Sequence, residues 1–287
     1  MSIPSSIVGV RSPDYRYQVD ARWLMAYAAG VGDFAPCYFD TTGEIVPHPL
    51  FPVCLEWDPI LAVRNGPGSG SVSPEEKARA VHAEHDLHWR RPLRAGMELV
   101  TRATAIGLEQ RAPGAYLTKR IDTFDTEGTL ICQTYQGNLY RGVAVSGGPV
   151  CHEPCPALPA PPPPAALSIQ ATLNVPTNAA HLYTECARIW NPIHTDKAAA
   201  LAAGLPDIIL HGTATLAYAI SSLIAQHVAR GPSAVYRLGG RFSGMVRLPD
   251  ALVVESSVTA PGTLHFRVVN AAGLEVIRRG FLCYRED

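Results

Sequence analysis

A proline-rich segment near the middle of the chain separates two stretches that are each long enough to build a hydrophobic core. Residues 154–164 read Pro-Cys-Pro-Ala-Leu-Pro-Ala-Pro-Pro-Pro-Pro. Proline fixes its own φ and has no backbone N–H, so this segment favours extended polyproline II over helix or sheet. We predict that residues 151–166 form a linker between a first repeat, 1–150, and a second repeat, 167–287. A polyproline ligand for another protein is the alternative.

The two repeats show the same order of expected elements. Each has a mostly apolar helix, at 49–63 and at 213–228, which is followed by a series of strands. The expected strands are 83–89, 98–107, 115–124 and 129–140 in the first repeat, and 236–242, 252–259, 262–269 and 275–284 in the second. A helix followed by an antiparallel meander, present twice, predicts an α+β fold. The 287 residues, 47% of them hydrophobic, suffice for both cores.

Composition narrows the classes of partner. The net charge of −1 gives no electrostatic footprint for nucleic acid. No apolar run approaches the roughly 18 residues of a membrane span, and the start of the chain lacks the pattern of a secretory signal. The seven cysteines are irregularly spaced, which favours reduced thiols and a cytoplasmic location.

A metal site is not expected either. His82, His85 and His88 recur at a spacing of three, which would place them on one face of a helix. Their neighbours are typical of a strand, in which His82 and His88 point one way and His85 the other. Since a closed set of ligands is also missing, we predict no metal and no cofactor.

One segment of the second repeat carries candidate chemistry. Residues 188–196 read Arg-Ile-Trp-Asn-Pro-Ile-His-Thr-Asp, and Leu-His-Gly-Thr follows at 210–213. The histidine of the first motif, His194, can exchange a proton near neutral pH. The amide of Asn191 can bind backbone or substrate, and the Gly212 N–H at a helix start can bind an oxyanion. We therefore predict that His194, Asn191 and Gly212 are catalytic in a reaction on a polarised thioester carbonyl.

Three neighbours of these residues are predicted to contact the substrate. They are His211, Thr213 and Trp190. Each has a structural alternative: the His211 ring can brace the turn, Thr213 can supply a hydroxyl at the helix start, and Trp190 can belong to the core.

The spacing of both motifs resembles the signature of the MaoC-like, type 2 enoyl-CoA hydratases, roughly Gly-Asp-x-Asn-Pro-(Leu/Ile)-His. This resemblance implies a double hot-dog fold, in which each curved sheet wraps a helix. It also implies a hydro-lyase that adds water to a trans-2-enoyl-CoA or removes it from the (R)-3-hydroxyacyl-CoA. The expected substrate is an acyl-CoA or an acyl-carrier thioester. In the family, an aspartate and the histidine together hold the water.

The chain departs from this signature at the aspartate. Ile189 stands at that position, or Arg188 if one residue is inserted, and neither side chain is a base. Glu185 is the nearest carboxylate in sequence. The first repeat shows the complementary pattern, because Asp33 keeps the family's aspartate whereas Tyr38 replaces the histidine.

In two-repeat members of the family, the second repeat usually catalyses and the first opens room for the acyl tail. Asp33 and Tyr38 are therefore predicted to contact substrate, with a turn cap as the alternative for Asp33. A site that combines Asp33 with His194 requires the two loops to meet.

Two other functions stay open on the sequence. A hot-dog thioesterase would need a carboxylate near a helix start, which Asp33 or Glu56 could supply. A non-catalytic acyl-binding subunit would need a second hot-dog chain to complete its site. A homodimer is also compatible with the sequence, because a double hot dog is already a pseudo-dimer.

Overall fold

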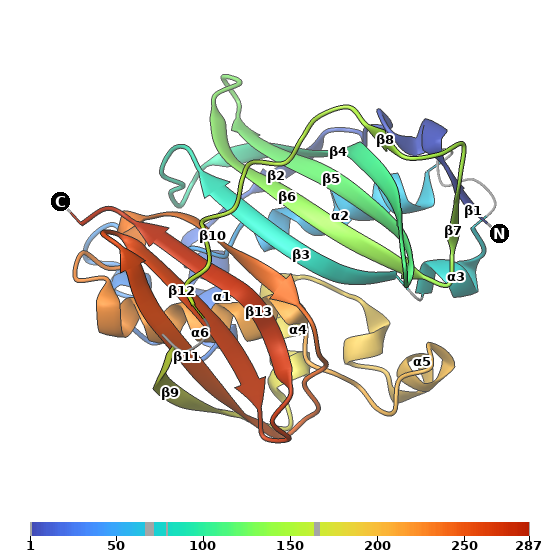
Figure 1. The fold of residues 1–287 in the computed structure, drawn as a ribbon. Helices are drawn as coiled ribbons and strands as arrows, with labels where there is room; N and C mark the ends of the chain where they lie inside the picture. Colours follow the sequence, from blue (N-terminus) through green and yellow to red (C-terminus); the bar gives the residue numbers. More distant parts are fainter. Residues whose placement is uncertain (1, 67–71, 79, 164–166, 287) are drawn as a thin grey trace. The chain divides into compact units, whose positions relative to one another are not determined.

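The computed structural model describes residues 2–66, 72–78, 80–163 and 167–286 (Figure 1). The chain divides into two compact units, each built from segments that are far apart in sequence. Unit 1 comprises Met1–Gln18, Leu55–Arg91 and Glu98–Leu158, and unit 2 comprises Val19–Cys54, Pro92–Met97 and Pro159–Asp287. Part of the first repeat therefore belongs to the same unit as the second repeat. The repeat limits at 1–150, 151–166 and 167–287 stay a prediction, and residues 164–166 of the linker lie outside the described residues.

Unit 1 is an antiparallel sheet with a helix along one face (Figure 1). Its strands follow the order β2 (Tyr15–Gln18), β4 (Glu98–Arg111), β5 (Gly114–Asp125), β6 (Leu130–Arg141) and β3 (Ala80–Trp89). The short β8 (Val150–Cys151) pairs with β4, and β1 (Ser2–Pro4) pairs in parallel with β7 (Ala144–Ser146). The helices are α2 (Val53–Asn65) and the short α3 (Pro74–Ala78).

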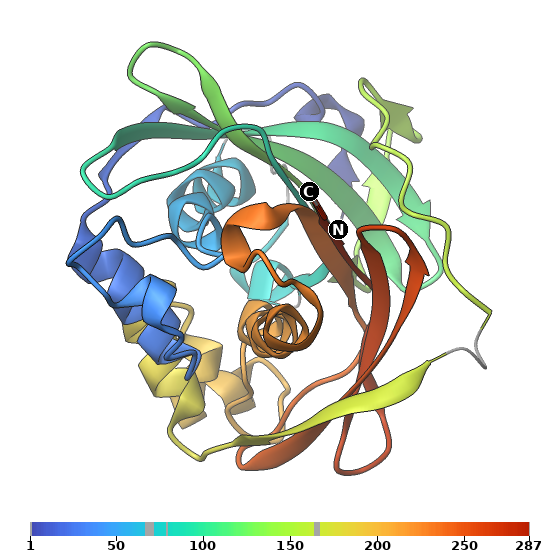
Figure 2. The same cartoon turned by 90° about the vertical axis from the view of Figure 1, so that its left-hand side faces the viewer.

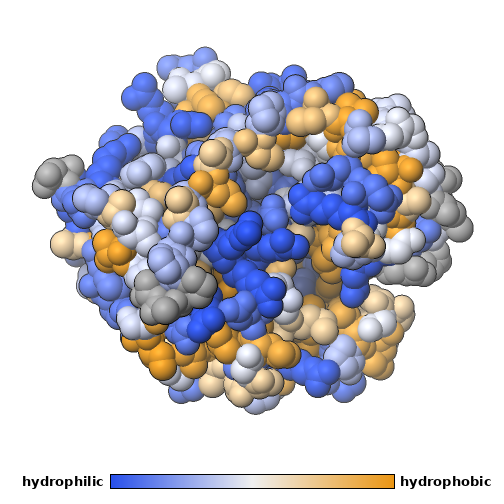
Figure 3. Space-filling model, in the orientation of Figure 1, coloured by the Kyte–Doolittle hydropathy of each residue, from blue (hydrophilic) through white to orange (hydrophobic). Residues whose placement is uncertain are grey.

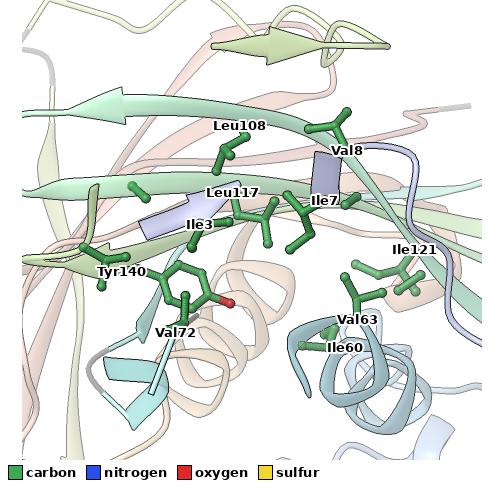
Figure 4. Packing of buried hydrophobic residues seen from close by; sticks show 14 residues of the cluster. Ile3, Ile7, Val8, Ile60, Val63, Val72, Leu108, Leu117, Ile121 and Tyr140 are labelled. Carbon is green, nitrogen blue, oxygen red and sulfur yellow. The ribbon is translucent and has the colours of Figure 1, made fainter. Parts of the chain in front are cut away.

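The core of unit 1 follows from the two-residue period of its strands (Figure 4). Leu117 and Ile121 lie four positions apart along β5, an even separation that places them on the same face of the sheet, and both are buried. They pack in one cluster with Ile60 and Val63 of α2 and with Ile7 near the N-terminus. Burial of such aliphatic side chains contributes roughly 1.5–3 kcal/mol each, so this cluster fixes α2 on the sheet.

Unit 2 repeats the arrangement. Its sheet follows the order β10 (Val235–Phe242), β13 (Glu275–Tyr284), β12 (Thr263–Asn270), β11 (Asp250–Ala260) and β9 (Ser168–Val175), with antiparallel neighbours. Helix α6 (Gly212–His227) packs against β9, β10 and β13, and Figure 2 looks almost along its axis. The apolar residues predicted at helical spacing on α6 are buried: Leu216, Ala219, Ile220, Leu223 and Ile224.

Two shorter helices of unit 2, α1 (Ala21–Gly30) and α4 (Ala179–Ala187), lie side by side (Figure 2). Their approach is close, because a Cβ added at Gly30 would lie 2.6 Å from the Cβ of Cys186. A left-handed residue follows each helix: Gly32, with φ +68°, lies two residues after α1, and Arg188, with φ +56°, directly follows α4. Gly32 and Arg188 lie four residues before Pro36 and Pro192, so the two repeats have equivalent backbone conformations here.

Each left-handed residue leads into a short 3-10 turn, η2 (Pro36–Tyr38) and η5 (Pro192–His194). After η5 the chain forms α5 (Lys197–Ala202), whose N-cap Asp196 accepts bonds from the Ala198 and Ala199 N–H groups. The strands and long helices predicted from the sequence are confirmed, whereas β9 and the short strands β1, β2, β7 and β8 were not predicted.

The surface drawn in Figure 3 alternates between hydrophilic and hydrophobic residues, so apolar groups on this face are interrupted by polar ones. Among the described residues, the helices are all too short or too polar to cross a membrane.

Candidate active site

The candidate site begins where α4 ends. Arg188 adopts the left-handed conformation there, and its guanidinium lies 3.9 Å from the centre of the Trp23 ring. Asn191 is extended, and the fixed φ of Pro192 then starts η5. The His194 N–H donates to the Asn191 carbonyl at 3.1 Å. The Asn-Pro pair thus sets the turn that carries His194.

His194 is held in one tautomer. Its Nδ1 lies 2.8 Å from the Ile209 carbonyl oxygen. A carbonyl only accepts, so Nδ1 carries the proton and Nε2 is left with the lone pair of the neutral ring. The side chain is buried, and this burial lowers the pKa of His194 to about 4, although the bond to Ile209 opposes the shift. At neutral pH the ring is therefore a proton acceptor through Nε2.

His211 lies directly against His194. The two ring centres are 3.6 Å apart and the planes are inclined by 26°. His211 is buried, and its Nε2 lies 3.3 Å from the Thr184 hydroxyl. Burial and the neighbouring His194 hold the pKa of His211 well below its usual value. This geometry favours the bracing role over the substrate contact predicted for His211.

Gly212 is the first residue of α6. The N–H groups of the first helical turn have no acceptor within the helix and lie at the positive end of its dipole. A Cβ at Gly212 would lie 2.9 Å from the Phe242 ring, so any larger residue would have to displace that ring. The backbone here suits the oxyanion role predicted for Gly212. The hydroxyl of Thr213 is engaged by the Tyr183 hydroxyl, which donates to it at 3.0 Å.

Ile189, at the position of the family aspartate, has an apolar side chain and is buried in the structure. Its backbone N–H donates to the Thr184 carbonyl. Trp190 is 57% exposed, so the alternative that placed it in the core is wrong, and the substrate contact predicted for it stays a prediction. Its indole N–H lies 3.4 Å from the Glu185 carboxylate, and Glu185 is exposed.

The corresponding loop of the first repeat also lies in unit 2. Asp33 accepts from the Ala35 N–H at 3.2 Å, which closes a turn. Tyr38 is fully buried, and this burial together with nearby Asp33 raises the pKa of Tyr38. The negative charge of Asp33 also favours higher pKa values at Cys37 and His48. The groups that Asp33 influences here therefore belong to the loop of the first repeat.

Sequence reasoning missed His48. It is fully buried, its Nδ1 accepts from the Leu50 N–H at 3.1 Å, and its Nε2 therefore donates to the Ser221 hydroxyl at 3.1 Å. Burial lowers the pKa of His48 to about 4, and Asp33 opposes this shift. The signal was present, because Pro-His-Pro at 47–49 precedes α2 as Leu-His-Gly at 210–212 precedes α6.

Aromatic rings join the two loops in a column whose two halves have the same order of residue types, except that Tyr38 stands at one end and His194 at the other. The ring-centre distances are 5.9 Å from Tyr38 to His48, 5.4 Å from His48 to Tyr27, and 5.8 Å from Tyr27 to Tyr183. They are 4.9 Å from Tyr183 to His211 and 3.6 Å from His211 to His194. From each end toward the centre, the column runs from a tyrosine or histidine to a histidine and then to a tyrosine. The two repeats therefore contribute equivalent rings.

Glu56 lies elsewhere, in the first turn of α2 in unit 1. It is buried and accepts a hydrogen bond from the Thr134 hydroxyl. Burial raises the pKa of Glu56 to about 7, although the Thr134 bond opposes this shift.

Comparison with known protein families shows which family has a domain with this fold and these motifs. Residues 162–278 match the MaoC like domain, which includes the Asn-Pro-Ile-His motif, η5 and α6. The chain carries a MaoC-like dehydratase domain. Residues 6–134 match a different model, which is described as FAS1-like, dehydratase domain region. The MaoC-like resemblance expected from the sequence is therefore confirmed, together with an enzyme of the hydro-lyase type.

Two curated proteins are similar to the MaoC-like chain over much of its length. Enoyl-CoA hydratase 2, peroxisomal, of Arabidopsis thaliana is 26% identical over 262 residues, which cover 85% of this chain and 83% of that protein. Peroxisomal multifunctional enzyme type 2 of Drosophila melanogaster is 28% identical over 207 residues, 70% of this chain but only 34% of that protein. Because both are named as peroxisomal, the cytoplasmic location stays a prediction.

Solved structures confirm the fold. A MaoC-like dehydratase of Phytophthora capsici superimposes with a TM-score of 0.81 at 21% identity, covering 96% of this chain and 97% of that one. A Mycobacterium tuberculosis protein described as a double hotdog fold gives a TM-score of 0.58 at 16% identity, covering 96% and 97%. The predicted α+β double hot dog is therefore the fold of this chain.

Proposed function

We propose that this MaoC-like chain adds water to a 2-enoyl thioester, or removes it from a 3-hydroxyacyl thioester, at a site formed by His194 and Gly212. The observation that carries this proposal is the fixed tautomer of His194. The bond from Nδ1 to the Ile209 carbonyl leaves Nε2 as the basic nitrogen, and Gly212 directly follows the residue that stacks against this ring.

The chemistry of hydration can be written with these two groups. The thioester carbonyl accepts from the Gly212 N–H, which stabilises the negative charge that develops on its oxygen. Nε2 of His194 takes a proton from water while the water oxygen bonds to the β-carbon and the C=C electrons move toward the carbonyl. The imidazolium then returns its proton to the α-carbon. Dehydration is the reverse sequence.

Ile189 makes this site slower than a site with two proton-handling groups. A positioned acid or base contributes about 10²- to 10⁴-fold to a rate, and a hydrocarbon side chain contributes none of it. Substrates with an already acidic α-proton, such as 3-hydroxyacyl thioesters that carry a second carbonyl group on the α-carbon, depend less on the missing group. We therefore expect such substrates, linked to CoA or to an acyl carrier, to be turned over best.

The proposal is tested by incubating the purified chain with crotonyl-CoA and longer 2-enoyl-CoAs. Enoyl absorbance should fall while the amount of free thiol stays constant, because hydration leaves the thioester intact. Release of thiol without prior hydration would instead support a thioesterase. If neither signal changes with any substrate, the proposal fails, and a binding subunit that needs a second hot-dog chain becomes the better account.

Restoring the family carboxylate should accelerate the reaction. Ile189→Asp is expected to raise kcat by roughly 10-fold or more, because it returns a group that can hold and deprotonate water. Ile189→Asn is the matched control, since the asparagine side chain has the same shape as aspartate but does not accept a proton. Because Ile189 is buried, thermal unfolding of both variants must be measured beside their activity. An equal gain in both variants, or no gain in folded Ile189→Asp, would contradict the role given to this position.

A further inference from the structure

We propose that His211 is a positioning residue, which holds the imidazole of His194 in one orientation and shields it from water. The Thr184 hydroxyl in turn fixes His211. The kinetic part of this inference rests on the proposed function, whereas its structural part does not.

The first step of the inference is that His211 is buried against two aromatic rings. One face lies against His194 at 3.6 Å between ring centres, and Tyr183 lies 4.9 Å from the ring on an inclined plane. Tyr183 is itself buried and anchored, because its hydroxyl donates to that of Thr213. A ring enclosed in this way contacts its neighbours and has little surface left for a substrate.

The second step concerns rotation. The bond from His194 Nδ1 to the Ile209 carbonyl fixes one edge of the imidazole. A ring held by a single hydrogen bond can still tilt about that bond, and the nearly parallel His211 ring at 3.6 Å prevents this tilt. The 3.3 Å contact from His211 Nε2 to the Thr184 hydroxyl then prevents His211 from turning away. Together these contacts fix the direction in which the lone pair of His194 Nε2 points.

The first repeat supplies an internal comparison. His48 occupies the equivalent place in the ring column, but Leu50 and Ser221 hold its two nitrogens. Its ring centre lies 5.9 Å from that of Tyr38, at an angle of 38°. The close stack therefore occurs only in the loop that carries a histidine able to act as a base. A buried histidine without this stack suffices for the fold of the first loop.

The structural test follows the ring signals of His194 by NMR between pH 5 and pH 8. In the wild-type chain, His194 should stay neutral down to pH 5. In His211→Ala, water can reach the exposed face of the ring, so the titration midpoint should rise by one pH unit or more toward the value of a solvated histidine, about 6.5. In His211→Phe the aromatic stack is kept, and the midpoint should stay below pH 5.

His48→Ala is the matched control, because it removes an equally buried histidine from the equivalent position. It should lower the unfolding temperature as His211→Ala does, yet leave the titration of His194 unchanged. The inference is overturned if His194 titrates alike in His211→Ala and wild type, or if His48→Ala shifts it equally. If His211→Ala does not fold, His211→Phe still decides, because a His194 midpoint above pH 5 in that variant contradicts positioning by stacking.

Kinetics supply the second readout. His211→Ala should lower kcat by about 10- to 100-fold, within the range for loss of a well-oriented catalytic geometry, while KM changes by less than about 3-fold. The acid limb of kcat/KM should move to higher pH with the His194 midpoint. A rise in KM at constant kcat would show that His211 binds substrate instead, which overturns the inference. Absence of turnover in the wild type would refute the proposed function. The NMR titration of His194 would then be the test of the positioning role.

Discussion

Replacement of His194 by alanine is expected to lower kcat/KM for the hydration of a 2-enoyl thioester by about 10²- to 10⁴-fold. The reason is that Nε2 of this ring is the proton acceptor of the proposed reaction, and the hydrocarbon of Ile189 cannot replace it. The oxyanion site at the Gly212 N–H is retained in the variant. Binding should therefore change little, and most of the loss should appear in kcat.

His227→Ala is the control for this experiment. His227 lies in the last turn of the same helix that begins at Gly212, and it is half-buried with its Nε2 3.2 Å from the Gln170 side chain. Its removal should leave kcat/KM within about 2-fold. Both variants must first be shown to unfold cooperatively, since His194 is buried. A folded His194→Ala variant with wild-type activity would exclude this histidine from the chemistry.

Acidification from pH 6.5 to pH 5 is expected to destabilise the folded chain by several kcal/mol. Four buried histidines, His48, His85, His194 and His211, have pKa values lowered to about 4 or further by burial. Above pH 6.5 both folded and unfolded chains hold them neutral. Below it, only the unfolded chain takes up protons, which costs roughly 1.4 kcal/mol per pH unit for each histidine. Over this range the four together amount to about 8 kcal/mol.

Glu56 acts in the opposite direction. Burial raises its pKa to about 7, so the folded chain binds this proton at a higher pH than the unfolded chain does. Over the same range its uptake offsets about 2 kcal/mol. The net loss of about 6 kcal/mol is comparable to the whole stability of many domains, roughly 5–15 kcal/mol. Unfolding by acid is therefore expected to set in near pH 5.

The measurement is urea unfolding followed by circular dichroism at several pH values between 7.5 and 5. His85→Phe removes one of the four histidines, which belongs to unit 1, whereas the proposed site belongs to unit 2. It should reduce the net slope of unfolding free energy against pH by about a third, because one histidine accounts for about 2 kcal/mol of the net 6 kcal/mol. A free energy of unfolding that stays constant or rises as the pH falls to 5 would show that these histidines are protonated in the folded state.

Much of the fold was predictable because it follows from local periodicity. The apolar spacing of α6 and the alternation of the eight long strands identify the elements within a few residues. Strand β9 carries the same signal, with Ile169, Ala171 and Leu173 on alternate positions, but the adjacent proline-rich segment concealed it. The sequence could not predict which segments of the chain make up each compact unit. Residues 19–54 join unit 2 because α1 packs against α4, and that contact joins residues more than 150 positions apart.

The candidate site was predictable only where a motif has fixed spacing. The motif at 188–196 identified His194, and the helix after His211 identified Gly212. The proposed role of His211 and the presence of His48 depend on the ring column, whose six rings come from six separate helices, turns and loops. The core alternative for Trp190 followed from the large apolar area that aromatic residues usually bury. Trp190 is exposed instead, and its indole N–H lies beside Glu185.

The central claim is that His194 transfers the proton in a hydration at the α- and β-carbons. The most direct measurement is NMR of the product formed from crotonyl-CoA in D₂O by the wild type and by His194→Ala at equal concentrations of folded protein. We predict an intact 3-hydroxybutyryl thioester with one deuterium at C2 from the wild type, formed at least 100-fold more slowly by the variant, the lower end of the usual acid–base contribution. Formation of this product at the same rate by both proteins, or release of free acid from unhydrated substrate, would contradict the claim.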